Sequence, residues 1–430
     1  MADAARARET GDMPGELETL AKLGASGLYP NKCWADLTRQ LAPSIKVPPA
    51  VLHKVPTKAG LDTLPVLMPH ELLASIYDTF PAVWVKVVKP SDSRAEQFWR
   101  SVKGHPALES SPLLARPNYQ RLCIPLGVHG DAVPITGLGK AWCQQLTDLS
   151  FMSLLGLGSV KELLFYMGGF WEKLRVMSND MNGTAHKFLA VLAWSFQILW
   201  EGRPLQLARL PNFCGLASHV LESLRMAIVV WQIILPFAAT SWNELLENMQ
   251  SFWKLLQQQY SDLAVPCKGA EIRHLSRPIF NIWAAKMNPA LEIHRKIHLL
   301  LKLNANAEQL LTDHRELFAL PSRDASVFET SIDGVLMLQH QLQGHFQDEP
   351  QKLFNVTEKS HFAQHCGILA RHVSPRLLWC FSGEDQQRRV QELTQASVKG
   401  NGPGSALIKV ATRYRMALHV QFHKIEAKRA

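Results

Sequence analysis

The sequence has no closely spaced pair of cysteines. Its seven cysteines are an odd number, scattered along 430 residues, and no two stand at the short spacing of a zinc ribbon. This pattern excludes a disulfide-stabilised small domain and a zinc ribbon. Because unpaired thiols persist in reducing compartments, we expect an intracellular protein, either nuclear or cytoplasmic.

Long apolar runs are also missing. The longest, residues 226–239, is interrupted by Gln232 and falls short of the roughly 20 residues that a membrane-spanning helix needs. The first 20 residues mix both signs of charge and contain no apolar core of a secretory signal. We therefore expect no membrane segment and no signal peptide, and interpret 226–239 as buried core.

Charged residues are scarce at 19%, whereas apolar residues make up 47%, a balance that excludes a disordered chain. Lys and Arg number 46 against 37 Asp and Glu, a net charge of +9. The densest basic stretch contains Arg295, Lys296 and Lys302. Since positive surfaces attract polyanions, these three are the candidate nucleic-acid-binding residues, and DNA is the candidate partner.

The order of expected elements divides the chain into four parts. Prolines punctuate residues 1–120 and favour a helical N-terminal module with short helices over 72–80 and 94–102. A capping box of Ser93 and Glu96 is expected at the start of the second helix. The first part of an α/β core follows over 121–235, a helical insertion over 236–372, and a last core strand with C-terminal helices over 373–430.

The core pattern predicts several strands and helices. Residues 159–167 fit a helix as well as a strand. The expected strands cover 122–128, 147–155, 163–170, 224–231 and 375–381. The expected helices cover 184–200, 242–260, 290–303, 307–318, 331–345, 386–397 and 405–423. This order predicts a helix-rich α/β fold with a small mixed sheet that resembles an RNase H-like core.

Three acidic residues occupy candidate catalytic positions in that core. Asp131 follows the first expected strand, and Glu384 and Asp385 open the helix after the last one. In RNase H-like cores, carboxylates from the first strand, the fourth strand and the last helix hold two Mg²⁺ or Mn²⁺ ions. The second acid is missing here, because no acid follows Trp231 before Glu244. Alternatively, the three acids only cap a turn and a helix N-terminus.

His361 and His365 are a candidate metal pair. Their i, i+4 spacing on an expected helix is one that zinc uses, and Cys366 and His372 lie nearby in the sequence. Phe362 stands where a zinc peptidase has its catalytic Glu. A solvated or packed helix is the alternative interpretation, and a zinc-dependent hydrolase is a third functional hypothesis.

Residues 125–142, PLGVHGDAVPITGLGKAW, resemble a large multicopy family of uncharacterised, transposon-derived proteins of dinoflagellates. Residues 69–72, 193–202 and 375–385 support the resemblance, which covers about 27–422. It implies an ancestral, RNase H-like transposase core. The family's acidic Gly-Asp-x-Asp stretch and paired cysteines are replaced here by 232–239 and the single Cys267, which implies that strand-transfer activity has been lost.

The sequence therefore predicts a transposase-derived, RNase H-like protein without strand transfer and with weak nucleic-acid binding. Beyond Mg²⁺ or Mn²⁺ at an intact carboxylate site, no cofactor is expected. The alternative is a non-enzymatic helical scaffold that binds other proteins. The two differ in the dependence of DNA affinity on salt, which is steep only when phosphates are contacted.

Overall fold

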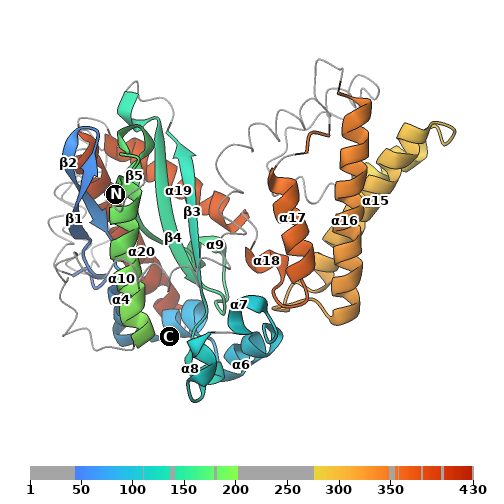
Figure 1. Ribbon diagram of the computed structural model, residues 1–430. Coiled ribbons are helices and arrows are strands. Elements are labelled where there is room, and N and C mark those ends of the chain that lie inside the picture. The colour runs from blue at the N-terminus through green and yellow to red at the C-terminus, as the bar shows by residue number, and fades with distance from the viewer. Residues whose placement is uncertain are drawn as a thin grey trace, which may run out of the picture.

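The computed structural model describes residues 44–109, 111–135, 141–178, 182–201, 276–347, 354–356, 358–378, 381–398 and 401–428. These residues form a helix-rich protein with two small sheets, which confirms the predicted helix-rich α/β character (Figure 1). Both sheets are antiparallel. The strand predicted over 224–231 and the helix predicted over 242–260 lie outside the described residues.

The N-terminal part contains a β-hairpin, so it is not all helical as expected. Strands β1 (Val51–Thr57) and β2 (Gly60–Val66) pair antiparallel. Pro56 and Pro65 argued against strands, because proline cannot donate a ladder hydrogen bond. A two-stranded sheet tolerates them, since each strand has an outer edge that needs no donor. Gly60 closes the turn with a φ of 105°, which favours glycine.

Helices α4 (Pro69–Thr79) and α6 (Asp92–Ser101) confirm the two predicted N-terminal helices. The cap of α6 is Ser91 rather than Ser93: the Ser91 hydroxyl accepts a hydrogen bond from the Arg94 N–H at 3.1 Å. The segments between and after them are short. They are α5 (Pro81–Val83), η1 (Trp84–Val88), α7 (Pro106–Glu109), η2 (Pro112–Ala115) and α8 (Tyr119–Leu122).

The second sheet is a meander of strands β3 (Leu126–Pro134), β4 (Gln145–Ser153) and β5 (Phe165–Trp171), in that order. The predicted first strand began too early, because residues 119–122 form α8. It also ended too early, so Asp131 lies within β3 rather than after it. The ambiguous segment 159–167 divides between α9 (Val160–Leu163) and the start of β5.

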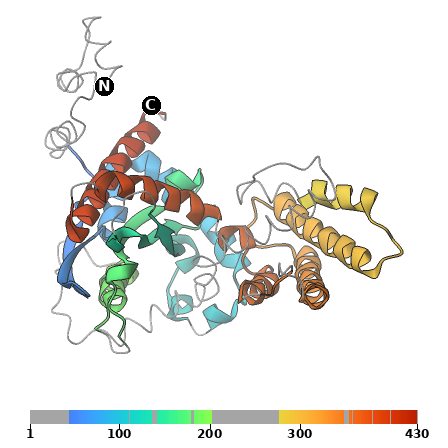
Figure 2. The same cartoon turned by 90° about the horizontal axis from the view of Figure 1, so that it is seen from above.

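Three long helices cover this sheet, and each confirms a predicted helix. They are α10 (Thr184–Glu201), α19 (Phe381–Val398) and α20 (Pro403–Ala427). Helix α10 lies on the opposite side of the sheet from α19 and α20 (Figures 1 and 2). The core between them is rich in fully buried aromatic side chains, namely Phe151, Phe165, Tyr166, Phe188, Tyr414 and Phe422.

The other helices form a separate helical part: α14 (Ser276–Lys286), α15 (Glu292–Asp313), α16 (Ser322–His345), α17 (Glu358–Leu369) and α18 (Pro375–Leu378). The break predicted between residues 303 and 307 is absent, because α15 continues through it. The strand predicted over 375–381 is wrong, since α18 and the start of α19 occupy it. Pro375 instead begins a helical turn, in which the Leu377 N–H donates to Ser374 O at 2.9 Å.

A second hydrophobic cluster joins the helical part to the sheet. Phe98 and Trp99 of α6 pack with Phe318 and Val373, and the Arg94 guanidinium lies 4.6 Å from the centre of the Phe318 ring.

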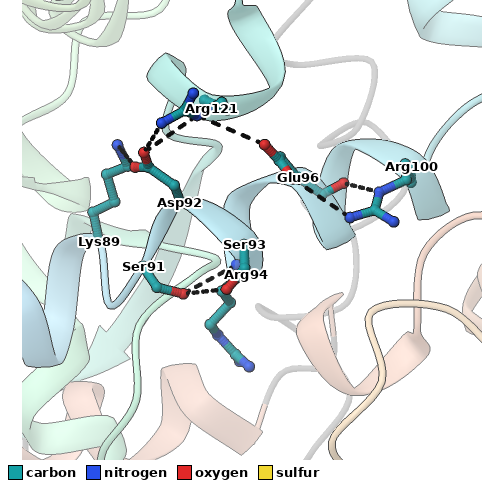
Figure 3. A network of polar contacts seen from close by, with 8 residues as sticks. All are labelled: Lys89, Ser91, Asp92, Ser93, Arg94, Glu96, Arg100 and Arg121. Carbon is teal, nitrogen blue, oxygen red and sulfur yellow. Dashed lines mark hydrogen bonds and ion pairs between the residues drawn. The ribbon is translucent and has the colours of Figure 1, made fainter.

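Beside this cluster, Asp92 pairs with Arg121 at 2.8 Å and with Lys89 at 2.7 Å, and Glu96 pairs with Arg100 (Figure 3). Of these, the pair of Asp92 and Arg121 links α6 to α8.

Candidate carboxylate site

Two aspartates face each other across the first two strands of the meander. In the β3–β4 register Asp131 stands directly opposite Asp148. Directly opposed residues of an antiparallel pair project from the same face of the sheet, with Cβ atoms about 5 Å apart. Asp131 is 8% exposed and Asp148 is fully buried. The register therefore builds a buried pair of carboxyl groups at the first predicted catalytic position.

Polar and aromatic groups surround the pair on the same face. The Ser150 hydroxyl donates weakly to Asp148 Oδ2 at 3.5 Å, and Asp131 Oδ1 accepts the N–H of Ala132 at 2.7 Å. Asp148 Oδ1 has no hydrogen-bond partner among the described residues. The buried rings of Tyr166 and Tyr414 lie 5.4 Å apart, and Asp148 acts electrostatically on both.

Helix α19 packs against β3 and closes this face. Its Gln391 side chain donates to Pro134 O, at the end of β3, at 2.7 Å. The first turn of α19 contains Glu384 and Asp385, whose side chains lie outside the described part of the structure. Gln386, the next residue, is 1% exposed. The structure therefore places the predicted helix beside Asp131 without describing the two acids themselves.

Burial controls the electrostatics of the pair. Desolvation is the first cause that raises the pKa of Asp148 well above its ordinary value, and repulsion from Asp131 is the second. The hydrogen bond from Ser150 opposes both effects but is outweighed. Burial also lowers the pKa of His129, which is opposite Ser150 on β3, to about 4. We therefore expect His129 to be a neutral imidazole at neutral pH, and the raised pKa of Asp148 favours its uncharged form.

The chemistry open to this arrangement is limited by access. Carboxylate oxygens suit Mg²⁺ and Mn²⁺, and two from neighbouring strands with further acids from α19 would suit a two-metal centre. Among the described residues, however, no group of three or more His, Cys, Asp or Glu side chains is placed to hold a metal ion. In the described part of the chain, helix α19 covers this face of the sheet, Asp131 keeps 8% of its surface exposed and Asp148 has none.

The three predicted nucleic-acid-binding residues lie on α15 but differ in their surroundings. Arg295 donates to the carbonyls of Pro289 and Ala290, at 2.7 and 3.0 Å. Lys296 pairs with Glu292 at 2.8 Å. Lys302 is exposed, seven residues beyond Arg295 and so on the same helical face. The structure thus places one exposed stripe here rather than a dense basic cluster.

The predicted histidine group is only partly assembled. His361 and His365 are adjacent on α17, with their Nε2 atoms 3.0 Å apart. His372 packs instead beside His105, with ring centres 5.9 Å apart. Burial raises the pKa of Cys366 to about 11, so its thiol stays protonated at neutral pH.

Asp148 is the residue that sequence reasoning missed. A signal for it exists, since this acid lies within the short apolar run of the strand expected over 147–155. An acid in a buried strand is destabilising unless another polar group lies next to it. Pairing the first two strands of the meander in register would have identified Asp131 as that group.

Comparison of the chain with protein-family models, with curated proteins and with solved structures gives no match. Among the described helices, none combines the length and the apolar character needed to cross a membrane.

Proposed function

We propose that the chain is a transposase-derived protein with an RNase H-like core, which has lost strand transfer and binds nucleic acid weakly. One observation supports this most: Asp131 lies on the first strand of a three-stranded antiparallel meander that α19 covers. A helix, α10, follows the meander in the chain. RNase H-like enzymes use a carboxylate on this strand and another on a late helix.

The burial of the carboxyl pair accounts for the loss of activity. A metal-dependent transfer needs ionised carboxylates and an open path for the phosphodiester. Asp148 is fully buried, and its raised pKa favours the uncharged form, which is a poor ligand for a metal ion. If Mg²⁺ or Mn²⁺ bound here, Asp131 with Glu384 or Asp385 would supply the charged ligands.

Weak nucleic-acid binding follows from the charge of the chain. The net charge of +9 favours polyanions, and Lys302 and Arg295 face solvent on α15. Since the guanidinium of Arg295 also donates to two local carbonyls, few phosphate contacts are expected from this helix. Few contacts give low affinity and little sequence preference.

Two measurements on the full chain test this proposal. A labelled DNA duplex incubated with the protein and Mn²⁺ or Mg²⁺ at pH 7 should give no cleaved or joined product. Fluorescence anisotropy should show weak DNA binding. The logarithm of the association constant should fall linearly with the logarithm of the salt concentration, with a slope of about −0.9 per phosphate contact. Turnover that Asp131→Asn abolishes would show that strand transfer survives. A DNA affinity that does not change with salt concentration would refute the proposed binding to nucleic acid.

A helical protein-interaction scaffold is the second candidate, and exposed apolar side chains on two helices that pack together, α15 and α16, favour it. Leu299 on α15 and Val327 and Met337 on α16 are 44%, 45% and 58% exposed. Large apolar side chains on neighbouring helices suit a protein partner better than a phosphate backbone. Absence of any salt-dependent DNA binding, together with a stable protein complex, would favour this candidate.

A further inference from the structure

We propose that His361 and His365 form a two-ligand surface site for a first-row transition metal ion, with copper(II) or nickel(II) preferred. The site is independent of the carboxylate pair and of the proposed function. It uses the two imidazoles as its protein ligands, and water completes the coordination. The observations that carry it are the position of the two rings, the distance between their nitrogens and their access to solvent.

Helix α17 brings the two rings together. Residues four apart on an α-helix lie one turn apart on the same face. The His361 and His365 ring centres are 4.4 Å apart, and their Nε2 atoms are 3.0 Å apart. His361 is exposed and His365 is half-buried. Both nitrogens therefore meet at a helix surface that an ion can reach from solvent.

The 3.0 Å separation allows both nitrogens to bind one ion. Two nitrogens bound at about 2.05 Å are about 2.9 Å apart at right angles and about 3.3 Å apart in a tetrahedral arrangement. The observed separation, which is that of a hydrogen bond between the two rings, lies between these values. The choice of metal follows from the ligand type, because imidazole nitrogens suit Cu²⁺ and Ni²⁺ and the affinity of such sites rises along the first-row series toward these two ions.

The binding step is a simple ligand exchange. In the free protein one Nε2 carries a proton and donates to the other. In the complex both Nε2 lone pairs bind the metal. The ring that had its proton on Nε2 releases it to water and takes up a proton on Nδ1, so each neutral ring still has one proton. Two metal–nitrogen bonds form while two metal–water bonds break, with no change in oxidation state. The ion links successive turns of α17 and is expected to stabilise that helix.

A second pair with the same spacing serves as an internal comparison. His419 and His423 on α20 also have ring centres 4.4 Å apart. There, however, His419 Nδ1 accepts the N–H of Lys46 at 3.4 Å, and both rings pack against Phe80. Lys46 and Arg415 act electrostatically on His419. Because these cations repel a metal ion, the pair on α17 is the one expected to bind.

Calorimetric titration of the full chain with Ni²⁺ tests the site, with His361→Gln and His365→Gln as site variants and His423→Gln as the matched control. The wild type and the control should bind about one equivalent. Each site variant should bind on the order of 10²-fold more weakly, because it loses the chelate.

Electron paramagnetic resonance with Cu²⁺ supplies a second readout. Two coordinated nitrogens are expected in the wild type and one in each site variant. All variants change solvent-accessible histidines, and circular dichroism should show unchanged folding. The proposal is overturned if the wild type binds no metal, or if the loss occurs in His423→Gln and not in the α17 variants.

Discussion

Asp131 and Asp148 occupy directly opposed positions on strands β3 and β4, with both side chains on the face that α19 covers. Two ionised acids at such positions repel each other. Burial first and this repulsion second raise the pKa of Asp148, which favours its protonated form. The contribution of the pair to the free energy of unfolding therefore depends on pH, and this dependence can be measured.

Asp148→Asn tests the protonation of the pair. The folded-state pKa of Asp148 is raised, so the folded protein binds the extra proton and wild-type stability declines as pH rises above the ordinary value near 3.9. Asparagine cannot ionise. The variant should therefore gain stability relative to wild type by up to roughly 1.4 kcal/mol per pH unit, until the pH reaches the folded-state pKa.

Urea unfolding of both proteins at intervals from pH 5 to pH 8 measures this difference. Asp131→Asn is the matched control. It removes the repulsion from Asp131, which is the smaller of the two causes of the raised Asp148 pKa, so the loss of stability with rising pH should become smaller without disappearing. Wild-type and Asp148→Asn stabilities that keep a constant difference over this range would contradict a raised pKa.

Tyr414→Phe tests how α20 is attached to the sheet. The Tyr414 hydroxyl donates to Leu164 O at 3.1 Å and accepts the Tyr166 N–H at 3.0 Å. Its removal leaves two buried backbone groups without this partner, which should lower the free energy of unfolding by about 1–3 kcal/mol. Tyr77→Phe, at a residue 64% exposed, should change it little. Equal effects in the two variants would argue against this role for Tyr414.

Lys302→Ala tests the basic stripe on α15. If Lys302 contacts a phosphate, its loss should reduce the slope of log affinity against log salt by about 0.9. Lys296→Ala is the paired comparison, since Lys296 already pairs with Glu292 and should contribute less. Anisotropy titrations at several salt concentrations give both slopes. An unchanged slope in Lys302→Ala would place the DNA-binding surface elsewhere.

Asp92→Asn tests the ion pairs at the junction of α6 and α8. Hydrogen bonds from Lys89 and Arg121 lower the pKa of Asp92 to about 2. Because this pKa is depressed, the stabilisation is present above the ordinary value near 3.9 and is lost as pH falls toward 2. Wild type should thus be more stable than Asp92→Asn at pH 6, and the gap should narrow toward pH 2.

Thermal unfolding at low and high salt provides the measurement, since these exposed pairs are screened by salt. Asp78→Asn changes an exposed acid on α4 and serves as the control for the loss of one surface charge. A gap that persists at pH 2 would mean that Asp92 acts through something other than its charge.

Local pattern accounts for much of the fold. Apolar residues at helical spacing identified α10, acidic residues at a helix start identified α19, and short apolar runs identified the β3–β5 meander. Errors arose where short-range signals compete with packing. Leu377 and its neighbours suit a strand by composition, yet they form α18 beside the cluster of Phe318 and Val373. The β1–β2 hairpin was missed because its prolines argue against strands. Proline is unfavourable only in a strand that is paired on both edges, and each strand of this hairpin is paired on one.

For the candidate site too, the sequence predicts some residues, whereas others depend on the tertiary structure. Residue types and their local spacing suffice to single out Asp131 and the His361–His365 pair, because a strand and a helix each impose a short, regular repeat. The partner of Asp131 depends instead on register, since a shift by one residue would move Asp148 to the other face of the sheet. Burial depends on α19, which lies about 250 residues further along the chain. Contacts between residues so far apart in the sequence form only when the chain folds, so the burial of the acid pair and the raised pKa of Asp148 depend on the tertiary structure.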